Sequence, residues 1–378
     1  MILCVVIGCG GNGAANPDAE NADAPAPIDT AIDAAFCPAI ATLDPSALAE
    51  ITVAGDTPAL GIFDPSIVYP SGATTGVMAY SAVPDQETIR THIAASTDHG
   101  ATWTLVTEVN TPEASTQPSP ECGGTTCSGN LISEVSSLVF DADDPDTSTR
   151  WKLFAHRYLV GPNVALHYAI GTITLQTAAQ PQGPWTAPQK LIGWTGSSSY
   201  SSTGVVANVS TMSGTASDCI ALTEPAAIWL PGTLDLAVGC VYDPAAPKIR
   251  IELLRSTTHA TSWGSVSTLL TADDAACSGL QPGLNGADLF ASGGTEYVVA
   301  TPADATGYRG CLVFTVDDIV AGKVKRDAQG KAIVDRAMTA SQFDGACTFA
   351  DGANGYALDV GFFASARPFR IFHAGATP

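Results

Sequence analysis

Short apolar runs separated by turn residues fill the chain from residue 51 to residue 378. Runs of about five to eight residues, bounded by Gly, Pro, Asn, Asp and Ser, are typical of β-strands, and no long amphipathic helical pattern is present. Five segments share one order: a small or acidic residue, a short strand, a turn and a second apolar strand. They are FDPSIVYPSG (63–72), SEVSSLVFDADD (133–144), TEPAAIWLPGT (223–233), GADLFASGGT (286–295) and GACTFADGANG (345–355). The pattern predicts an all-β protein with internal repeats.

The repeats extend beyond these two strands. A third apolar strand follows in at least four of them, and a tryptophan opens the predicted outer strand in three, at Trp103, Trp185 and Trp263. Four strands in each of five repeats predict a five-bladed β-propeller. The fifth repeat ends after three strands, so we expect residues 49–54 (AEITVA) to supply its outer strand and close the ring. A six-bladed, sialidase-like ring is the alternative if residues 193–222 hold a further blade.

One hairpin carries a recognisable turn. Residues 96–103 read STDHGATW, in which Gly100 tolerates a positive φ and Asp98 can accept hydrogen bonds from the backbone of the turn. The stretch resembles the Asp box, a repeated hairpin of sialidases and other β-propellers that lies away from their active sites. We therefore interpret Asp98 as structural. Residues 256–263 (STTHATSW) are a degenerate copy of the same turn.

The first fifty residues differ from the rest in composition. Residues 1–9 (MILCVVIGC) resemble the end of a signal peptide with a bacterial lipobox, which predicts lipidation at Cys9 and a place in the cell envelope; an ordinary secreted protein is the alternative. Residues 10–50 are rich in Ala, Asp and Pro and are expected to form a disordered linker. Residues 51–378 then form the propeller domain.

Charge and cysteines narrow the possible partners. The net charge of −21 argues against nucleic acid, anionic membranes and polyanionic substrates, so a neutral oligo- or polysaccharide is expected, and membrane contact only through a lipid anchor. Without Cys4 and Cys9, eight cysteines remain, which favours disulfides in an exported protein. Cys122 and Cys127 are expected to close a small loop, and Cys219 and Cys240 flank one predicted hairpin. No His lies at ligand spacing beside these cysteines, so no metal or cofactor is expected, and we expect a monomer.

Acidic residues open the first strand in three repeats. In a propeller these strands surround the axis, so Asp64, Glu134 and Glu224 are expected to face one funnel. Glycoside hydrolysis needs one carboxylate as base or nucleophile and one carboxylic acid that protonates the leaving oxygen. A third carboxylate nearby raises the pKa of that acid by like-charge repulsion. The three residues are therefore candidate catalytic residues.

Asp64-Pro65 and Glu224-Pro225 also carry a resemblance to a known group of enzymes. The repeat pattern over about residues 55–378 resembles the five-bladed β-propeller glycosidases of the arabinanase/β-xylosidase and invertase type. The resemblance implies that Asp64 is the base or nucleophile, that Glu224 is the general acid, and that Glu134 tunes pKa and orientation. Two positions depart from that group, since Glu134 stands in place of an Asp and Pro225 directly follows Glu224.

Further residues are candidates for substrate binding. His156 and Arg157 end a predicted second strand, and Trp194 and Tyr200 belong to a Gly/Ser-rich stretch where an aromatic ring can stack on a sugar. Packing roles are the alternative for all four. A sialidase is the competing enzyme, but the arginine expected just before the first strand is absent from Gly61-Ile62-Phe63-Asp64. A non-catalytic propeller that binds glycan or protein, and a purely structural lipoprotein, remain as alternatives.

Overall fold

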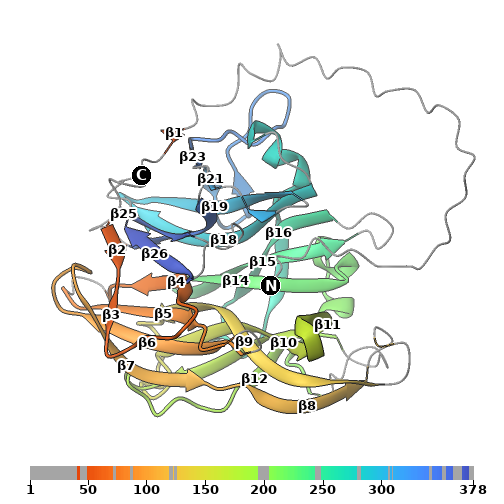
Figure 1. Ribbon diagram of the computed structural model, residues 1–378. Coiled ribbons are helices and arrows are strands. Elements are labelled where there is room, and N and C mark those ends of the chain that lie inside the picture. The colour runs from red at the N-terminus through yellow and green to blue at the C-terminus, as the bar shows by residue number, and fades with distance from the viewer. Residues whose placement is uncertain are drawn as a thin grey trace, which may run out of the picture.

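A computed structural model gives the arrangement of the strands (Figure 1). Predictions on Cys9, Cys37 and Tyr200, on the signal and on most of the linker lie outside the residues that it describes. Within these residues, no helix is long and apolar enough to cross a membrane. The described residues are 41–42, 49–70, 74–85, 88–118, 122, 126–194, 204–242, 248–278, 282–304, 307–308, 310–339, 343–350, 355–360 and 368–373.

The described strands form four hydrogen-bonded sheets, and the largest divides into two groups joined by a single parallel pair, Ile249 with Gly283. We call the resulting groups of consecutive, mainly antiparallel strands blades and number them in chain order. Blade 1 comprises β4 (Ile62–Val68), β5 (Gly76–Ala82), β6 (Arg90–Ser96) and β7 (Trp103–Asn110). Blade 2 comprises β9 (Thr126–Phe140), β10 (Trp151–Gly161), β11 (Ala165–Ala178) and β12 (Gln189–Gly193). Blade 3 comprises β14 (Ala221–Leu230), β15 (Thr233–Tyr242), β16 (Lys248–Ser256) and β17 (Gly264–Leu270).

The last two blades are built in the same way. Blade 4 comprises β18 (Pro282–Ser292), β19 (Thr295–Asp304) and β21 (Cys311–Asp318), with β22 (Lys323–Val324) and β23 (Arg336–Thr339) both paired to β21. Blade 5 comprises β24 (Phe343–Ala350), β25 (Gly355–Val360), β26 (Arg370–His373) and β2 (Ala49–Ile51). Short extra strands are β1 (Ala41–Thr42), β3 (Val53–Ala54), β8 (Glu113–Pro118), β13 (Ala207–Asn208) and β20 (Gly307–Tyr308).

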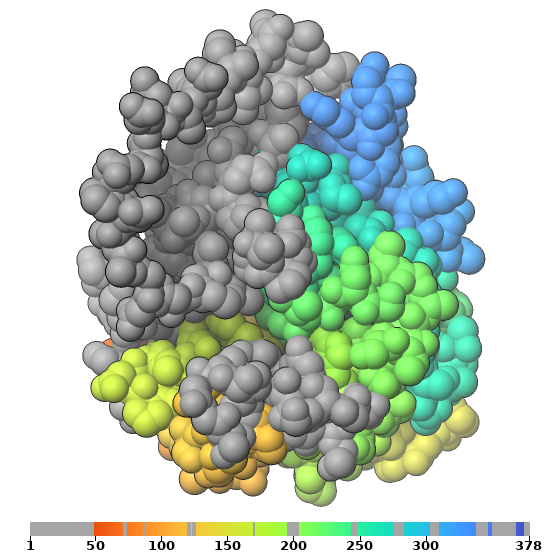
Figure 2. Space-filling model, turned by 90° about the vertical axis from the view of Figure 1, so that its right-hand side faces the viewer, coloured from red at the N-terminus to blue at the C-terminus, as the bar shows by residue number. Residues whose placement is uncertain are grey.

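The blades follow one another around the molecule, from orange through yellow and green to blue in Figure 1, and residues of blades 2 to 4 form one continuous surface in Figure 2. Most buried apolar residues lie between neighbouring sheets: Phe154 and Ile192 of blade 2, for example, share a cluster with Leu236 and Leu254 of blade 3. The prediction of an all-β propeller is confirmed. Short strands that are apolar at successive positions suit this fold, because each sheet is covered on both faces by its neighbours; all seven residues of β5, for example, are buried.

The N-terminal strand closes the ring, as predicted. β2 pairs antiparallel with β26 of blade 5, with Ile51 opposite Ile371, and β3 then pairs parallel with β7 of blade 1, with Val53 opposite Trp103. Residues 49–54 therefore contribute to two blades rather than one. A single chain segment joins the first and last sheets.

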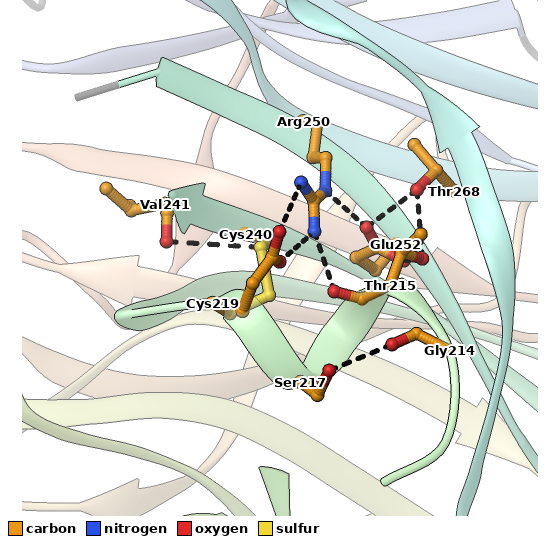
Figure 3. Close-up of a disulfide and its surroundings, with 10 residues drawn as sticks. Gly214, Thr215, Ser217, Cys219, Cys240, Val241, Arg250, Glu252 and Thr268 are labelled. Carbon is orange, nitrogen blue, oxygen red and sulfur yellow. Dashed lines mark hydrogen bonds and ion pairs between the residues drawn. A yellow bond between two sulfur atoms is a disulfide. The ribbon is translucent and has the colours of Figure 1, made fainter. Parts of the chain in front are cut away.

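Residues 204–220 pack on blades 2 and 3, because β13 pairs with β12 of blade 2 and Thr215 bonds Glu252 of blade 3. They contain β13 and two short 3₁₀ helices, Val209–Thr211 and Thr215–Asp218, and no further sheet. The second helix is fixed by the Cys219–Cys240 disulfide and by Arg250 of β16, which bonds Asp218 and Glu252, as Figure 3 shows. Two other 3₁₀ helices span Pro162–Val164 and Ala272–Ser278. The described part of residues 193–222 therefore forms no further blade between blades 2 and 3.

Disulfides and tryptophans test the finer predictions. The Cys122–Cys127 and Cys219–Cys240 pairings are confirmed, and Cys311–Cys347 joins blades 4 and 5. The side chains of the remaining Cys37 and Cys277 lie outside the described part. Trp103 begins β7 and Trp263 directly precedes β17, as expected. The prediction that Trp185 opens a strand is wrong: β12 begins only at Gln189, because Pro184 and Pro188 lack the N–H groups that a ladder needs.

The turn at residues 96–103 has the expected hydrogen bonds. Thr102 donates to Asp98 from both its backbone N–H and its hydroxyl, and Ser96 Oγ accepts from Gly100 N–H at 2.7 Å. The bonds from Thr102, with one from Ser96, lower the pKa of Asp98 to about 2. The corresponding Ser256 and Thr258 make the same bonds in the degenerate copy. The two sequences therefore build the same frame.

Side chains of the inner strands link neighbouring blades around the axis. In three blades, the residue that follows the bulge of the inner strand accepts a hydrogen bond from the backbone of the next blade. The acceptor–donor pairs are Ser66–Leu138, Ser137–Ala227 and Asp288–Phe349, at 3.0, 2.8 and 2.9 Å. In blade 3 the equivalent residue is Ala226, which has no acceptor. The bonds fix the height of one inner strand against the next, which sets the positions of the site residues.

Candidate active site

The candidate site lies where the inner strands are interrupted by β-bulges. The antiparallel register shifts in the inner strand of each of blades 1 to 4. In that order, the shifts lie between Phe63 and Ser66, between Glu134 and Ser137, between Thr223 and Ala226, and between Asn285 and Asp288. Each bulge contains a residue at positive φ. These residues are Asp64, Val135, Glu224 and Gly286, with φ of 49°, 48°, 49° and 54° in blades 1 to 4. A bulge redirects a side chain out of the normal alternation, which is how such sites are often built.

Asp64 and Glu224 occupy the same position of two different blades, as the sequence predicted. Each is followed by proline, at Pro65 and Pro225, and these prolines both border a small cavity of about 30 Å³ on the axis. Asp64 itself lines this cavity and is 8% exposed, whereas Glu224 is partly exposed. The inner strands therefore bring Asp64 and Pro225, the residue after Glu224, to one cavity although they are far apart in the chain.

Glu134 is not equivalent to these two residues. It pairs with His156, as Phe63 pairs with Ser81 and Thr223 pairs with Gly239, so it stands one residue before the bulge. Val135 takes the bulge position in blade 2. The predicted equivalence of Glu134 with Asp64 and Glu224 is therefore wrong by one residue. Glu134 is instead a regular, paired residue of its strand, and its side chain is buried.

Burial and a neighbouring charge determine the protonation of Glu134. Its carboxyl group is 8% exposed and accepts a hydrogen bond from the hydroxyl of Tyr158. Burial raises the pKa of Glu134 to about 7; the bond from Tyr158 opposes this rise, and the negative charge of Glu224 adds to it. Glu134 and Glu224 are thus electrostatically coupled across blades 2 and 3. Burial therefore favours the protonated form of this carboxyl.

Glu224 is held from blade 4. Asn285 Nδ2 donates to Glu224 Oε1 at 2.6 Å, and Asn285 Oδ1 accepts from the hydroxyl of Thr223 at 3.2 Å. Sequence reasoning missed Asn285, Thr223 and Tyr158. Tyr158 follows His156 by two residues in a strand, so their side chains share a face, and this alternation was an available signal. No sequence signal marks Asn285.

The other predicted site residues differ in their surroundings. His156 is 1% exposed, its ring lies 4.8 Å from that of Tyr158, and burial lowers its pKa to about 3. Arg157 donates to the exposed Glu113 at 2.6 Å. Trp194 is buried in the apolar cluster between blades 2 and 3. Contact of these residues with a substrate stays a prediction.

Three groups of side chains in the described part have metal-ligand chemistry. In one of them Asp218 lies beside Cys219 and Cys240, but these two sulfurs are joined in a disulfide. His167 lies within 3.8 Å of both Cys122 and Cys127, although it is distant in sequence, but the two sulfurs are joined in a disulfide and offer no thiolate. Asp141 and Asp144 converge with His259, but the buried ammonium group of Lys152 lies 3.4 Å from Asp141 and bonds Asp144. The ammonium group of Lys152 thus occupies the cluster formed by Asp141, Asp144 and His259.

Comparison with solved structures places the fold among glycosidases. A fructofuranosidase variant from Schwanniomyces occidentalis complexed with fructosylnystose aligns with 86% of this chain and 59% of its own, at a TM-score of 0.53 and 12% identity. A GH32 β-fructofuranosidase of Bombyx mori aligns with 84% of this chain and 58% of its own, at a TM-score of 0.50 and 13% identity. A thermostable family-43 glycoside hydrolase aligns with 85% of this chain and 91% of its own, at a TM-score of 0.50 and 9% identity.

These likenesses define the class of fold. The chain shares the fold of these glycosidases, as the sequence predicted. It spans less than two thirds of the length of the two fructofuranosidases. No family model and no curated protein matches the sequence.

Proposed function

We propose that the chain is a glycoside hydrolase that acts on neutral glycans. The observation that carries this proposal is the placement of Asp64 and Glu224 on identical bulges of blades 1 and 3, with a third carboxyl, Glu134, coupled to Glu224. The fold shared with glycosidases supports it. Glycosidic bonds are hydrolysed by such carboxyl pairs, so the geometry provides the groups that this reaction needs.

Each carboxyl has a role in the proposed reaction. Glu224, the more exposed of the three, donates its proton to the glycosidic oxygen as the bond to the anomeric carbon breaks. Asp64 either takes a proton from the attacking water or attacks the anomeric carbon itself; the separation of the carboxyls selects the path. Glu134 keeps a share of negative charge near Glu224, which favours the protonated form of the acid.

Hydrolysis of a panel of aryl glycosides and neutral polysaccharides tests the proposal, with Glu224→Gln and Asp64→Asn as site variants. Loss of the acid slows release of poor leaving groups by at least about 100-fold, while activated nitrophenyl groups, which need less protonation, lose less. Glu50→Gln is the matched control, because the side chain of Glu50 is 43% exposed and pairs with that of Arg370 at the surface. Undiminished hydrolysis by Glu224→Gln would refute the role of Glu224.

A non-catalytic glycan-binding propeller is the second candidate. Val135 at the bulge of blade 2 and the low exposure of Asp64 favour it, because both reduce the acidic groups open to a substrate. Calorimetric binding of a polysaccharide without any release of reducing ends would support this function instead. Anchorage outside the cytoplasm through Cys9 belongs to either proposal, and the disulfides support an exported protein.

A further inference from the structure

Asn285 connects blade 4 to the carboxyl group of Glu224. Its side chain is 6% exposed and lies between Thr223 and Glu224. The hydroxyl of Thr223 donates to Asn285 Oδ1, so the amide NH₂ group faces Glu224 Oε1. The opposite orientation of the amide would place its oxygen against the carboxylate, where two acceptors repel each other. The orientation of Asn285 is therefore fixed by its two partners.

Two glycines leave room for this chain of hydrogen bonds. A Cβ on Gly239 would lie 2.5 Å from Thr223 Oγ1 and 2.6 Å from Asn285 Oδ1, which is closer than van der Waals contact allows. A Cβ on Gly286, which has φ of 54°, would lie 3.3 Å from Glu224 Oε2. β15 and β18 therefore each have a glycine, without a side chain, where the hydrogen bonds from Thr223 to Asn285 and from Asn285 to Glu224 pass. Both strands are shaped around these side chains.

We propose that Asn285 is a positioning residue for Glu224, one that fixes the rotamer of the carboxyl group through its bond to Oε1. The chemistry of the contact gives this assignment. An amide N–H can only donate, so the contact holds Oε1 in place and stabilises the carboxylate form of Glu224. The inference rests on the proposed function, since it deepens the role of Glu224 as the acid.

Titration of Glu224 tests the contact without any substrate. The carboxyl carbon of Glu224 is followed by NMR in protein labelled with ¹³Cδ-glutamate, and its signal is assigned with Glu224→Gln. The amide donor stabilises the carboxylate, so we expect its removal in Asn285→Ala to move the midpoint to higher pH by about one unit. In Asn285→Asp, which keeps the size of the side chain, a second carboxylate should move it further.

Asn110→Ala is the matched control. Asn110 is also buried, at 5% exposed, and donates to a threonine, Thr91, but in blade 1. We expect this variant to lower thermal stability as Asn285→Ala does while leaving the Glu224 midpoint in place. An unshifted midpoint in both Asn285 variants would overturn the inference. So would an equal shift in Asn110→Ala, because it would report general loosening rather than the contact.

The kinetic test separates the inference from the function on which it rests. If the wild-type protein hydrolyses aryl glycosides, the basic limb of kcat/KM in Asn285→Ala should move upward together with the NMR midpoint. Poor leaving groups should lose at least about tenfold in kcat/KM, and activated ones less than about threefold. Equal losses for all leaving groups would overturn the positioning role. A wild-type protein without hydrolysis would refute the proposed function alone, because the titration still reads the Asn285 contact.

Discussion

Replacement of Glu134 by glutamine should make the stability of the protein less dependent on pH. The pKa of Glu134 is raised from an ordinary 4.5 to about 7 in the folded protein, mainly by burial. Between these values the unfolded chain loses the proton and the folded chain keeps it, so the free energy of unfolding falls as pH rises. Below about pH 4.5 both states are protonated and the carboxyl has no such effect. Above about pH 7 the free energy of unfolding is lowered by the full cost of ionising the buried carboxyl.

The size of the effect follows from the shift. Each pKa unit corresponds to 1.36 kcal/mol, so the full change amounts to roughly 3 kcal/mol between pH 4 and pH 8. Glutamine has nearly the same shape, still accepts the hydrogen bond from Tyr158 through its Oε1, and does not ionise. We therefore expect the difference in unfolding free energy, Glu134→Gln minus wild type, to become more positive by about this amount as pH rises.

Urea unfolding followed by tryptophan fluorescence at pH 4, 6 and 8 measures this difference. Glu113→Gln serves as the control, because an exposed ion pair is worth at most about 1 kcal/mol. A difference between Glu134→Gln and wild type that stays constant over the three pH values would contradict the raised pKa. A decrease at pH 8 would show that the carboxylate is stabilised by its surroundings, which is the opposite of the reasoning above.

Two further predictions concern the frame. Ser137→Ala leaves the N–H of Ala227 without its acceptor between blades 2 and 3, and should lower the free energy of unfolding by about 1–2 kcal/mol in the same urea assay; an unchanged midpoint would contradict a stabilising role of this bond. Gly100→Ala places a side chain at φ of 81° and should cost about 1 kcal/mol in thermal unfolding. Gly264→Ala, with no atom near its added Cβ, should be nearly neutral, and equal effects of both alanines would refute the argument from φ.

The sequence predicted those parts of the fold that depend on local patterns. Apolar runs indicated the strands, and Asp64-Pro65 and Glu224-Pro225 indicated two equivalent acidic positions, which the structure places on bulges of their strands. The turn at Gly100 and the closing strand at 49–54 were also visible. The contact of Asn285 with Glu224 was not, because it joins strands of different blades and depends on their relative height. The inter-blade bonds of residues such as Ser137 set that height.

Blade 2 shows why the third acid was misplaced by one residue. Its bulge contains Val135, a β-branched residue at φ of 48°, and neither proline nor glycine marks the position. Such a conformation costs on the order of 1–3 kcal/mol and persists only where the surrounding structure enforces it. The enforced bulge leaves the acid of this blade on the preceding residue, in contact with Tyr158 rather than at the bulge position that Asp64 and Glu224 share. A buried carboxyl there is poorly placed to meet a sugar, but its ionisation changes the field at Glu224, as the tuning role that we propose for Glu134 requires.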